Sequence, residues 1–477
     1  MKKIICSLFL VFLSFFVIFK DSLAFNDPLS TPNNIYGIGI INYSDLKDAS
    51  YLVNSTGGDW GYVTIVITKE QRDKNIWQDF FDEARKLHII PIVRVATKFD
   101  GKNWETPNIK DIDSWVNFFN SLNWVIENRY IVIGNESNHS KEWGGKINPE
   151  EYALYLKTFS ERLKNSNKDY FILPAGLDQA ATNSIITMDE KIYIQRMVKS
   201  IPNIFDYIDG LNSHSYPNPN FLGAETAIGR KSIRGYEWEL SLIKSFGVTK
   251  KLPVFITETG WVRTIKNEEI ITKKFKYAFT SVWSKDPQIV AVTPFILNYG
   301  QDPFFEFSWK NIDGSFFNVY NEIKSINKIA GLPIQKIEGE IIINFLNPFG
   351  SPNTLRRGYF IAKNTGQNIW SNLNIKIIDE EKEENSVIGI SKLYIEPNKS
   401  GLVVYTLKFP EKAGTYDLKL GLFVENKRIG NIFEGSIISI ETPVEKDNNL
   451  SDLINVTITK FYNFLSLTFS LGSKMLK

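Results

Sequence analysis

Cysteine is nearly absent from this chain of 477 residues. The only one is Cys6, which lies in an N-terminal segment that we expect to be removed. The mature chain would then contain no cysteine, and this excludes disulfide bonds and thiol chemistry.

Histidine is also scarce, with three residues in all. Glu136 and His139 have an E-x-x-H spacing, which binds a metal when both residues lie on one helix. That alternative stays open, but so few histidines favour chemistry by carboxylates. We therefore expect neither a metal nor a cofactor.

A large excess of charge of one sign is missing as well. Lysine and arginine number 55 and acidic residues 53, which gives a formal charge of +2. Residues 1–24 contain three lysines and one aspartate, so the charge of the remainder is zero. A neutral chain without basic clusters argues against nucleic acid as a partner.

Two motifs of other enzyme classes are missing too. No Gly-x-Ser-x-Gly appears, which argues against an acyl hydrolase. No Gly-rich phosphate loop follows the first predicted strand, because Gly37 and Gly39 lie within that strand.

The N-terminus has an apolar run that is too short to span a bilayer. Lys2 and Lys3 precede Ile4–Phe19, and small residues follow in Ser22-Leu23-Ala24. These features predict a signal peptide over residues 1–24 and a secreted or cell-surface protein. A retained N-terminal anchor is the alternative.

Strand-like runs alternate with helical patterns between residues 35 and 330. Most runs are apolar on both faces, as in strands that helices cover. Eight such units in roughly 300 residues are typical of a (β/α)8 barrel, and a doubly wound open sheet is the competing architecture. We expect strands at 35–42, 62–68, 89–96, 130–136, 170–176, 208–216, 253–258 and 289–298, and helices at 44–54, 70–87, 112–122, 149–164, 191–200, 236–246, 268–284 and 319–330.

The pattern changes after the expected barrel domain, residues 33–332. Short strand-like runs separated by turn residues predict a β-sandwich over residues 338–442. Residues 443–477 form a linker and an amphipathic tail, which is an interfacial helix, a docking helix or a partly disordered segment. The strands are expected at 341–345, 359–363, 373–378, 393–396, 402–409, 416–424 and 436–440, with a solvated acidic loop at 379–384.

Two glutamates stand at the ends of predicted barrel strands. Glu136 ends the fourth strand and Glu258 ends the seventh. The carboxyl ends of all eight strands meet at one mouth, where barrel enzymes have their active sites. Two facing carboxylates are what the cleavage of a glycosidic bond requires.

Asn135-Glu136 and Glu258 at these strand ends resemble the 4/7 barrels, or clan A, of retaining glycoside hydrolases, over residues 35–330. The resemblance implies that Glu136 is the acid/base, that Asn135 binds the sugar 2-hydroxyl and that Glu258 is the nucleophile. It also implies that Tyr216, in the run His214-Ser215-Tyr216, hydrogen-bonds to the nucleophile.

Further residues are expected to bind substrate or support the nucleophile. His214 and Tyr216 share one face of their strand, and Arg94 lies near the end of the third strand. Each could instead be a packed or ion-paired residue of the barrel.

Aromatic residues make up 14% of the chain, in keeping with either sugar stacking or a bulky core. Trp261 follows the expected nucleophile and is a candidate sugar platform. Many clan A members have a tryptophan at the end of strand eight, where this chain has Leu297-Asn298-Tyr299, so Tyr299 or Trp309 is expected to substitute. Trp104 and Trp143 are further loop candidates. Many members also have proline after the acid/base, where this chain has Ser137, and these departures leave the substrate open.

Residues 359–441 resemble Ig-like domains that are common on bacterial surface proteins. The matching elements are Lys363-Asn364-Thr365-Gly366, Trp370 and Ala413-Gly414-Thr415-Tyr416. The resemblance implies spacing or attachment, and the C-terminal region could hold the protein at a cell or membrane surface.

The sequence thus predicts a secreted retaining β-glycoside hydrolase that cleaves a polysaccharide or oligosaccharide by double displacement. Its carboxyl groups should lie about 5–5.5 Å apart. The alternatives are a catalytically silent glycan-binding protein, a transglycosylase that uses the same residues, and a surface protein in which the barrel is only a scaffold.

Overall fold

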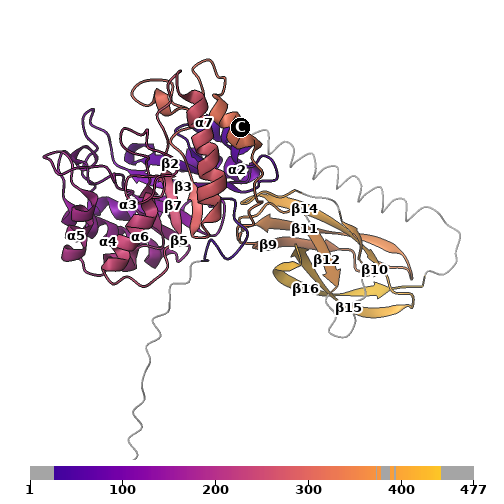
Figure 1. Ribbon diagram of the computed structural model, residues 1–477. Helices are drawn as coiled ribbons and strands as arrows, with labels where there is room; N and C mark the ends of the chain where they lie inside the picture. Colours follow the sequence, from indigo (N-terminus) through magenta and orange to yellow (C-terminus); the bar gives the residue numbers. More distant parts are fainter. Residues whose placement is uncertain (1–25, 372, 378–386, 391–393, 442–477) are drawn as a thin grey trace, which may run out of the picture. The chain divides into compact units, whose positions relative to one another are not determined.

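The computed structural model describes residues 26–371, 373–377, 387–390 and 394–441 (Figure 1). The chain divides into two compact units. The first runs to Glu338 and includes Thr365–Ile369, and the second contains Gly339–Asn364 and the chain from Trp370 onward. Three expected features lie outside the described residues, namely the signal peptide over 1–24, the acidic loop over 379–384 and the tail over 443–477.

Eight parallel strands form the centre of the first unit, and the eight predicted strands are confirmed. Five of them pair in the order β1-β2-β3-β4-β5, and three pair in the order β6-β7-β8. Most residues on both faces of these strands are buried, as expected for strands that helices cover. The bounds are β1 Gly37–Gly39, β2 Gly61–Thr68, β3 Ile89–Ala96, β4 Arg129–Ile133, β5 Tyr170–Pro174, β6 Leu211–His214, β7 Val254–Glu258 and β8 Ile289–Val292.

Hydrogen bonds close the two sheets into one barrel. Beyond the end of β8, the Gly39 nitrogen donates to the Pro294 oxygen and the Leu297 nitrogen donates to the Gly39 oxygen, both over 2.9 Å. Between β5 and β6, which we call the seam, the Asp209 nitrogen donates to the Ile172 oxygen over 2.8 Å. The Asp209 carboxylate in turn accepts from the Ile172 nitrogen over 2.7 Å. The predicted (β/α)8 barrel is therefore confirmed.

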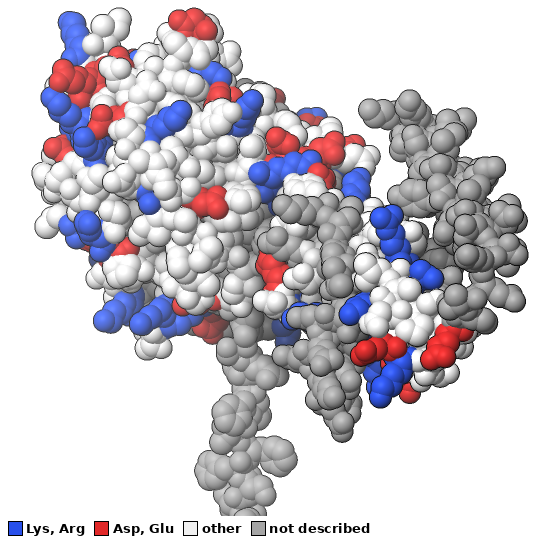
Figure 2. Space-filling view, turned by 90° about the vertical axis from the view of Figure 1, so that its right-hand side faces the viewer, with Lys and Arg blue, Asp and Glu red and all other residues white. Residues whose placement is uncertain are grey.

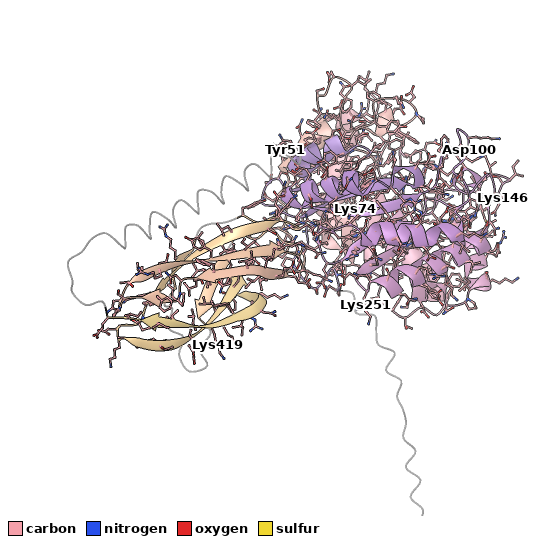
Figure 3. The ribbon with its side chains drawn as sticks, turned by 180° about the vertical axis from the view of Figure 1, so that it is seen from behind. Tyr51, Lys74, Asp100, Lys146, Lys251 and Lys419 are labelled. Carbon is pink, nitrogen blue, oxygen red and sulfur yellow. The ribbon has the colours of Figure 1, made fainter. Side chains whose placement is uncertain are left out.

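Helices surround these strands (Figures 1 and 3). Among the described residues, none of them combines the length and apolar character that a membrane crossing requires. The α-helices are α1 Leu46–Val53, α2 Lys74–Lys86, α3 Ile112–Asn120, α4 Pro149–Ser166, α5 Glu190–Ser200, α6 Gly235–Ser245, α7 Glu268–Tyr277 and α8 Asn318–Ser325.

The last helix is shorter than the predicted helix over 319–330. The chain turns extended at Ile326. The Lys328 ammonium donates hydrogen bonds to carbonyl oxygens at the helix end, including those of Ile323 and Lys324, over 2.9 and 3.1 Å. A side chain from beyond the helix therefore satisfies the terminal carbonyls that a longer helix would have bonded internally.

The second unit is an all-β sandwich of two four-stranded sheets. The strand orders are β10-β16-β15-β12 and β13-β14-β11-β9. A strand predicted over 393–396 is wrong, because Ile395 makes only an isolated bridge with Trp370. The strands β10 and β13 were not expected. The bounds are β9 Gly339–Leu346, β10 Phe349–Gly350, β11 Leu355–Asn364, β12 Leu373–Ile377, β13 Val387–Ile390, β14 Ser400–Lys408, β15 Gly414–Val424 and β16 Lys427–Ser439.

Charged side chains of both signs are interspersed on the face shown in Figure 2. Lysine and arginine lie beside aspartate and glutamate there, in small mixed groups. The near balance of charge in the sequence is thus also visible locally on this face.

Candidate active site

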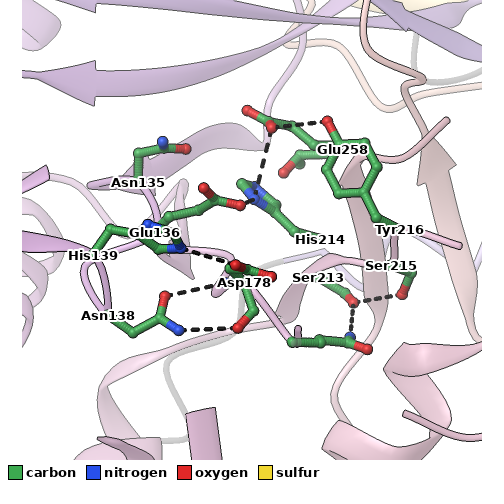
Figure 4. A network of polar contacts seen from close by, with 12 residues as sticks. Asn135, Glu136, Asn138, His139, Asp178, Ser213, His214, Ser215, Tyr216 and Glu258 are labelled. Atoms are coloured by element: carbon green, nitrogen blue, oxygen red, sulfur yellow. Dashed lines mark hydrogen bonds and ion pairs between the residues drawn. The ribbon is translucent and has the colours of Figure 1, made fainter. Parts of the chain in front are cut away.

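Glu136 and Glu258 face each other at the mouth of the barrel (Figure 4). One carboxylate oxygen of each and one ring nitrogen of His214 all lie within 4.8 Å of one another. Glu258 is the last residue of β7, and Glu136 follows the end of β4 by three residues. Strands that start 125 positions apart along the chain therefore bring the two carboxylates together.

A sharp turn after β4 places Glu136. Its φ is +26°, in the left-handed region that side chains with a Cβ atom rarely adopt, and Gly134 before it has a φ of +91°. The Glu136 nitrogen donates to the Gly176 oxygen over 2.9 Å. This conformation costs on the order of 1–2 kcal/mol, so the surrounding structure holds the backbone there.

His214 and Tyr216 connect the two carboxylates, as Figure 4 shows. The His214 Nδ1 atom lies 3.0 Å from Glu136 Oε1 and 3.7 Å from Glu258 Oε2. The Tyr216 hydroxyl donates to Glu258 Oε2 over 3.2 Å. The His214 ring is 2% exposed and the Tyr216 ring is partly buried, so the groups that the sequence placed on one strand face do converge on the carboxylates.

Arg94, in β3, completes the support of Glu258. Its Nη1 atom donates to Glu258 Oε1 over 3.0 Å and also to Asn135 Oδ1. Both side chains of the ion pair are more than four-fifths buried. Arg94, Asn135, His214 and Tyr216 thus all lie within one or two hydrogen bonds of the carboxylate pair.

Burial and negative charge act on the titratable partners. Burial disfavours the charged form of His214, but Glu258 and the hydrogen bond to Glu136 outweigh it and raise the histidine pKa above its usual value. Burial, and then the charge of Glu258, raises the pKa of Tyr216 well above 10. Tyr216 therefore stays a hydrogen-bond donor, and the raised pKa of His214 keeps a proton available between its ring and Glu136.

His139 does not join Glu136 in a metal pair on a helix. The next short helix begins only at Ser140, and His139 Nε2 lies 2.9 Å from Asp178 Oδ2. The neighbouring Asn138 donates to the main-chain oxygens of Asp178 and Met188, both over 3.0 Å. These contacts tie the loop after β4 to the loop after β5, and so support the position of Glu136.

The cluster that could ligate a cation is a different one: Glu136, His214 and Glu258. The Arg94 guanidinium already neutralises Glu258 there. Burial of the histidine and its pKa above the usual value also favour a proton over a metal on its ring. The residues thus fit acid–base and nucleophilic chemistry better than metal binding.

The expectation for Trp261 is wrong. Its side chain is 1% exposed, its ring packs edge-on against Phe275, and its Nε1 atom donates to the Gly223 oxygen over 2.8 Å. Trp143 and Trp309 are buried in the same way. These three rings pack in the hydrophobic core and offer no exposed face on which a sugar could stack.

Other aromatic rings lie near the carboxylates. Phe221 and Phe307 pack against Tyr216, with centroids 5.0 and 6.2 Å away, and Phe295 packs against Phe307 at 5.9 Å. All three phenylalanines are partly exposed. Tyr299 is partly exposed too and packs edge-on against Phe304. The sequence pointed to Tyr299 but gave no signal for the phenylalanines, which lie in loops or, for Phe307, in the short 3-10 helix Phe305–Phe307.

A third carboxyl group at the mouth was also missed. Glu142 lines a pocket with Arg94, Asn135 and Trp104. Its pKa is raised to about 7: burial contributes most to the rise, Glu136 and Glu258 add to it, and Arg94 opposes it. Its position in the loop after β4 belongs to no periodic pattern, so the sequence alone did not identify it.

The loops after β3 and β4 lie side by side around this pocket. The Trp104 nitrogen donates to the Lys141 oxygen, and the Gly144 nitrogen donates to the Trp104 oxygen, both over 2.8 Å. Figure 3 shows Asp100 and Lys146, from these two loops, near each other at one edge of the first unit. The pocket is therefore built by two loops that brace each other.

No family model and no curated protein matches the chain. Among solved structures, it is similar to a monomeric beta-xylosidase from Caulobacter crescentus, with 10% identity, a TM-score of 0.43 and coverage of 80% of this chain and 98% of that one. It is also similar to a beta-glucuronidase from Bacteroides uniformis, with 12% identity, a TM-score of 0.41 and coverage of 88% and 47%. A third is endo-glycoceramidase II from Rhodococcus sp., with 10% identity, a TM-score of 0.38 and coverage of 80% and 99%. At these TM-scores, the function of this chain is a question for the chemistry of its own site.

Proposed function

We propose that the protein is a retaining β-glycoside hydrolase that cleaves O-glycosidic bonds of a polysaccharide or oligosaccharide. The observation that carries the proposal is the carboxylate pair at the barrel mouth, with oxygens of Glu136 and Glu258 within 4.8 Å. Inverting glycosidases need about 6.5–9.5 Å between their carboxyl groups to admit a water molecule. The shorter separation favours direct attack by one carboxylate.

Glu258 is assigned as the nucleophile because donors surround it. Arg94 and Tyr216 donate to its two oxygens over 3.0 and 3.2 Å, and such hydrogen bonds stabilise and orient the ionised form. Glu136 lacks a guanidinium partner and contacts His214 instead. It is therefore the group assigned to hold and transfer a proton.

The reaction then proceeds in two displacements. Glu258 attacks the anomeric carbon, the bond to the leaving oxygen breaks, and Glu136 gives that oxygen its proton. In the second step, Glu136 takes a proton from water, the water oxygen attacks the anomeric carbon, and Glu258 leaves as a carboxylate. Two inversions at one carbon give net retention.

The test is hydrolysis of a panel of β-linked oligosaccharides and aryl β-glycosides by the protein lacking residues 1–24. We expect Glu258→Gln to abolish cleavage of every substrate that the wild type cleaves. Glu136→Ala should lose roughly 10²–10⁴-fold on oligosaccharides. It should still release 2,4-dinitrophenol in a first turnover, because that leaving group needs no proton. Glu105→Gln, which removes an exposed carboxylate from the neighbouring loop, is the control.

Proton NMR of the first product formed identifies the anomer. Inversion at the anomeric carbon would contradict the double displacement. Transfer to sugar acceptors in preference to water would identify a transglycosylase, and glycan binding without cleavage across the panel would identify a silent binding protein.

We further propose that residues 1–24 direct export and that the all-β unit is an Ig-like module that spaces or attaches the enzyme at a surface. The support is the signal-like run after Lys2 and Lys3, together with the turn motifs of the module. Fractionation of cells that express the full chain, beside a variant without residues 1–24, tests the export.

A further inference from the structure

Four isoleucines are the most exposed large apolar side chains in the described part of the chain. Ile185, Ile228, Ile265 and Ile312 are 95%, 75%, 96% and 73% exposed, and every other isoleucine, leucine or aromatic side chain there is at most 66% exposed. Single apolar side chains on a surface are ordinary. The placement of these four is not, because one lies in each of the loops after β5, β6, β7 and β8. All four therefore belong to the mouth of the barrel.

A closed turn presents Ile185 together with Ile186. The Ser184 nitrogen donates to the Thr187 oxygen over 2.8 Å, and the Ser184 hydroxyl accepts from the Ile186 and Thr187 nitrogens over 3.1 and 2.9 Å. Ile186 is itself 61% exposed. Both isoleucines are thus fixed at the tip of their loop.

Two further turns present Ile265 and Ile312 in the same way. The turn at residues 264–267 closes with a main-chain hydrogen bond of 3.2 Å, and the turn at residues 311–314 closes with one of 3.0 Å. Each isoleucine is the second residue of its turn. Turns favour glycine, proline, asparagine, aspartate and serine. An exposed isoleucine there gains nothing from the turn or from packing, which points to a contact outside the chain.

These tips occupy only one half of the rim. In the loops after β1 to β4, the exposed apolar side chains reach 45% at most, at Ile41 and Tyr43. The pocket that contains Trp104 and Glu142 lies in that other half. A surface that met the tips would therefore leave one side of the mouth free for a sugar chain.

Separate tips fit a lipid surface better than a folded partner. Polar residues flank the isoleucines in each closed turn, so the apolar side chains do not join into one patch. A stable protein interface needs about 800 Å² on each partner, with complementary shapes. Acyl chains are fluid and close around separate apolar side chains without such complementarity.

The charges beside the tips match phospholipid head groups. Lys231 and Lys266 lie within three positions of an isoleucine, are exposed, and form no ion pair with a described residue. Lysines at a membrane surface keep their ammonium groups among the head groups and are attracted to anionic lipids. The acidic side chains in the same windows already have partners: Glu225 pairs with Lys274, and Glu268 and Asp313 accept from the nitrogens of Asn318 and Ser315.

We propose that these isoleucines dock the barrel mouth on a lipid surface, and that the substrate is a glycan carried by a lipid of that surface. The substrate class rests on the proposed function, whereas the docking does not. Loops that surround the carboxylate pair bring the membrane to the active site, so a lipid-linked glycan reaches the carboxylates without leaving the bilayer.

The first arm of the test measures binding without catalysis. The protein lacking residues 1–24 is floated with vesicles of phosphatidylcholine, alone or mixed with phosphatidylglycerol. The wild type should bind both, and the mixture more tightly. The combined variant Ile185→Ser, Ile228→Ser, Ile265→Ser and Ile312→Ser should bind at least about ten-fold more weakly, with its melting temperature nearly unchanged.

The matched control combines Ile76→Ser, Leu154→Ser and Ile270→Ser, which change exposed side chains of α2, α4 and α7. It should bind as the wild type does. A wild type that does not bind vesicles, or a mouth variant that binds like the control, would overturn the docking. A dimer that sedimentation detects and the mouth variant abolishes would overturn it too, because the tips would then be a contact between two copies.

The second arm compares a soluble aryl β-glycoside that the wild type cleaves with the same sugar linked to diacylglycerol in the vesicles. The mouth variant should keep its kcat/KM on the soluble substrate and lose at least about ten-fold on the vesicles. Equal rates of wild type and variant on the vesicles would overturn the substrate class. If the wild type cleaves neither, the proposed function fails together with the substrate class, and vesicle binding still decides the docking.

Discussion

The Tyr216 hydroxyl is one of two side-chain donors that hold Glu258, at 3.2 Å from Oε2. The substitution Tyr216→Phe removes this hydroxyl but keeps the partly buried ring and its packing against Phe221. A hydrogen bond to a charged group contributes about 1.5–3 kcal/mol. We therefore expect kcat/KM to fall roughly 10- to 150-fold with the melting temperature nearly unchanged.

Steady-state kinetics and a thermal melt check this expectation. Tyr43→Phe is the matched control, because Tyr43 is 45% exposed. Wild-type kinetics in Tyr216→Phe would mean that Arg94 alone orients the nucleophile.

Sequence reasoning reached Asn135, Glu136, His214, Tyr216 and Glu258 because each occupies or closely follows the end of a strand. Strand ends follow from apolar periodicity, and parallel strands send their ends to one mouth. Glu142 and the partly exposed phenylalanines escaped notice because loops have no such period. The prediction that Trp261 is a sugar platform was wrong, because a position close to the nucleophile in the sequence does not determine the direction in which the side chain points.

At the scale of elements, the loop after β5 and the strand β6 approach each other too closely for a side chain. A Cβ atom on Gly176 would lie 2.1 Å from His214 Cδ2. The Gly176 oxygen also holds the Glu136 nitrogen. Gly176→Ala must therefore displace the ring, the carbonyl group or both, at a cost of about 1–3 kcal/mol for overpacking.

We expect Gly176→Ala to lose at least about ten-fold in kcat/KM and to melt several degrees lower. Gly300→Ala is the control, because no atom lies within 4 Å of a Cβ atom there. Retained activity in Gly176→Ala would show that His214 tolerates displacement.

Elements were predicted well where a run is apolar on both of its faces, as in most of the barrel strands. Their ends were predicted less well, because tertiary contacts decide them. The carbonyl groups at the end of α8 bond to Lys328, a partner that periodicity does not reveal. β10, with two residues, is too short to show any pattern.

At the scale of the whole molecule, a buried acid pair links α5 and α6. Glu190 and Glu239 are 0% and 2% exposed and contact each other. Burial raises the pKa of Glu239 to about 7. Burial, and then the charge of Glu239, raises the pKa of Glu190 still further above its usual value. The pair therefore shares at least one proton at neutral pH.

This pair should make the fold less stable as the pH rises. The folded-state pKa of Glu239 exceeds the unfolded value near 4.5, so its contribution is complete below pH 4.5 and is lost as the pH rises through about 7. The raised pKa of Glu190 continues the loss above that pH. Glu239→Gln cannot ionise, and its free energy of unfolding should exceed that of the wild type by roughly 1–3 kcal/mol at alkaline pH.

Urea unfolding of both proteins at several pH values measures the difference. The two stability curves should converge or cross on the acid side, where the wild-type pair is fully protonated. Parallel curves from acid to alkaline pH would mean that the pair does not control the pH dependence.

The active site spans the seam between β5 and β6. Arg94 belongs to the five-stranded sheet and Glu136 follows its strand β4, whereas His214 and Glu258 belong to the three-stranded sheet. The ion pair between Arg94 and Glu258 therefore ties one sheet to the other. The distance between the two carboxylates therefore depends on how closely the two sheets approach each other. If the two sheets moved apart by about an ångström or two at the seam, the site would still contain the same residues. The larger distance between the carboxylates would then admit a water molecule, and the reaction would invert the anomeric configuration where the closer pair retains it.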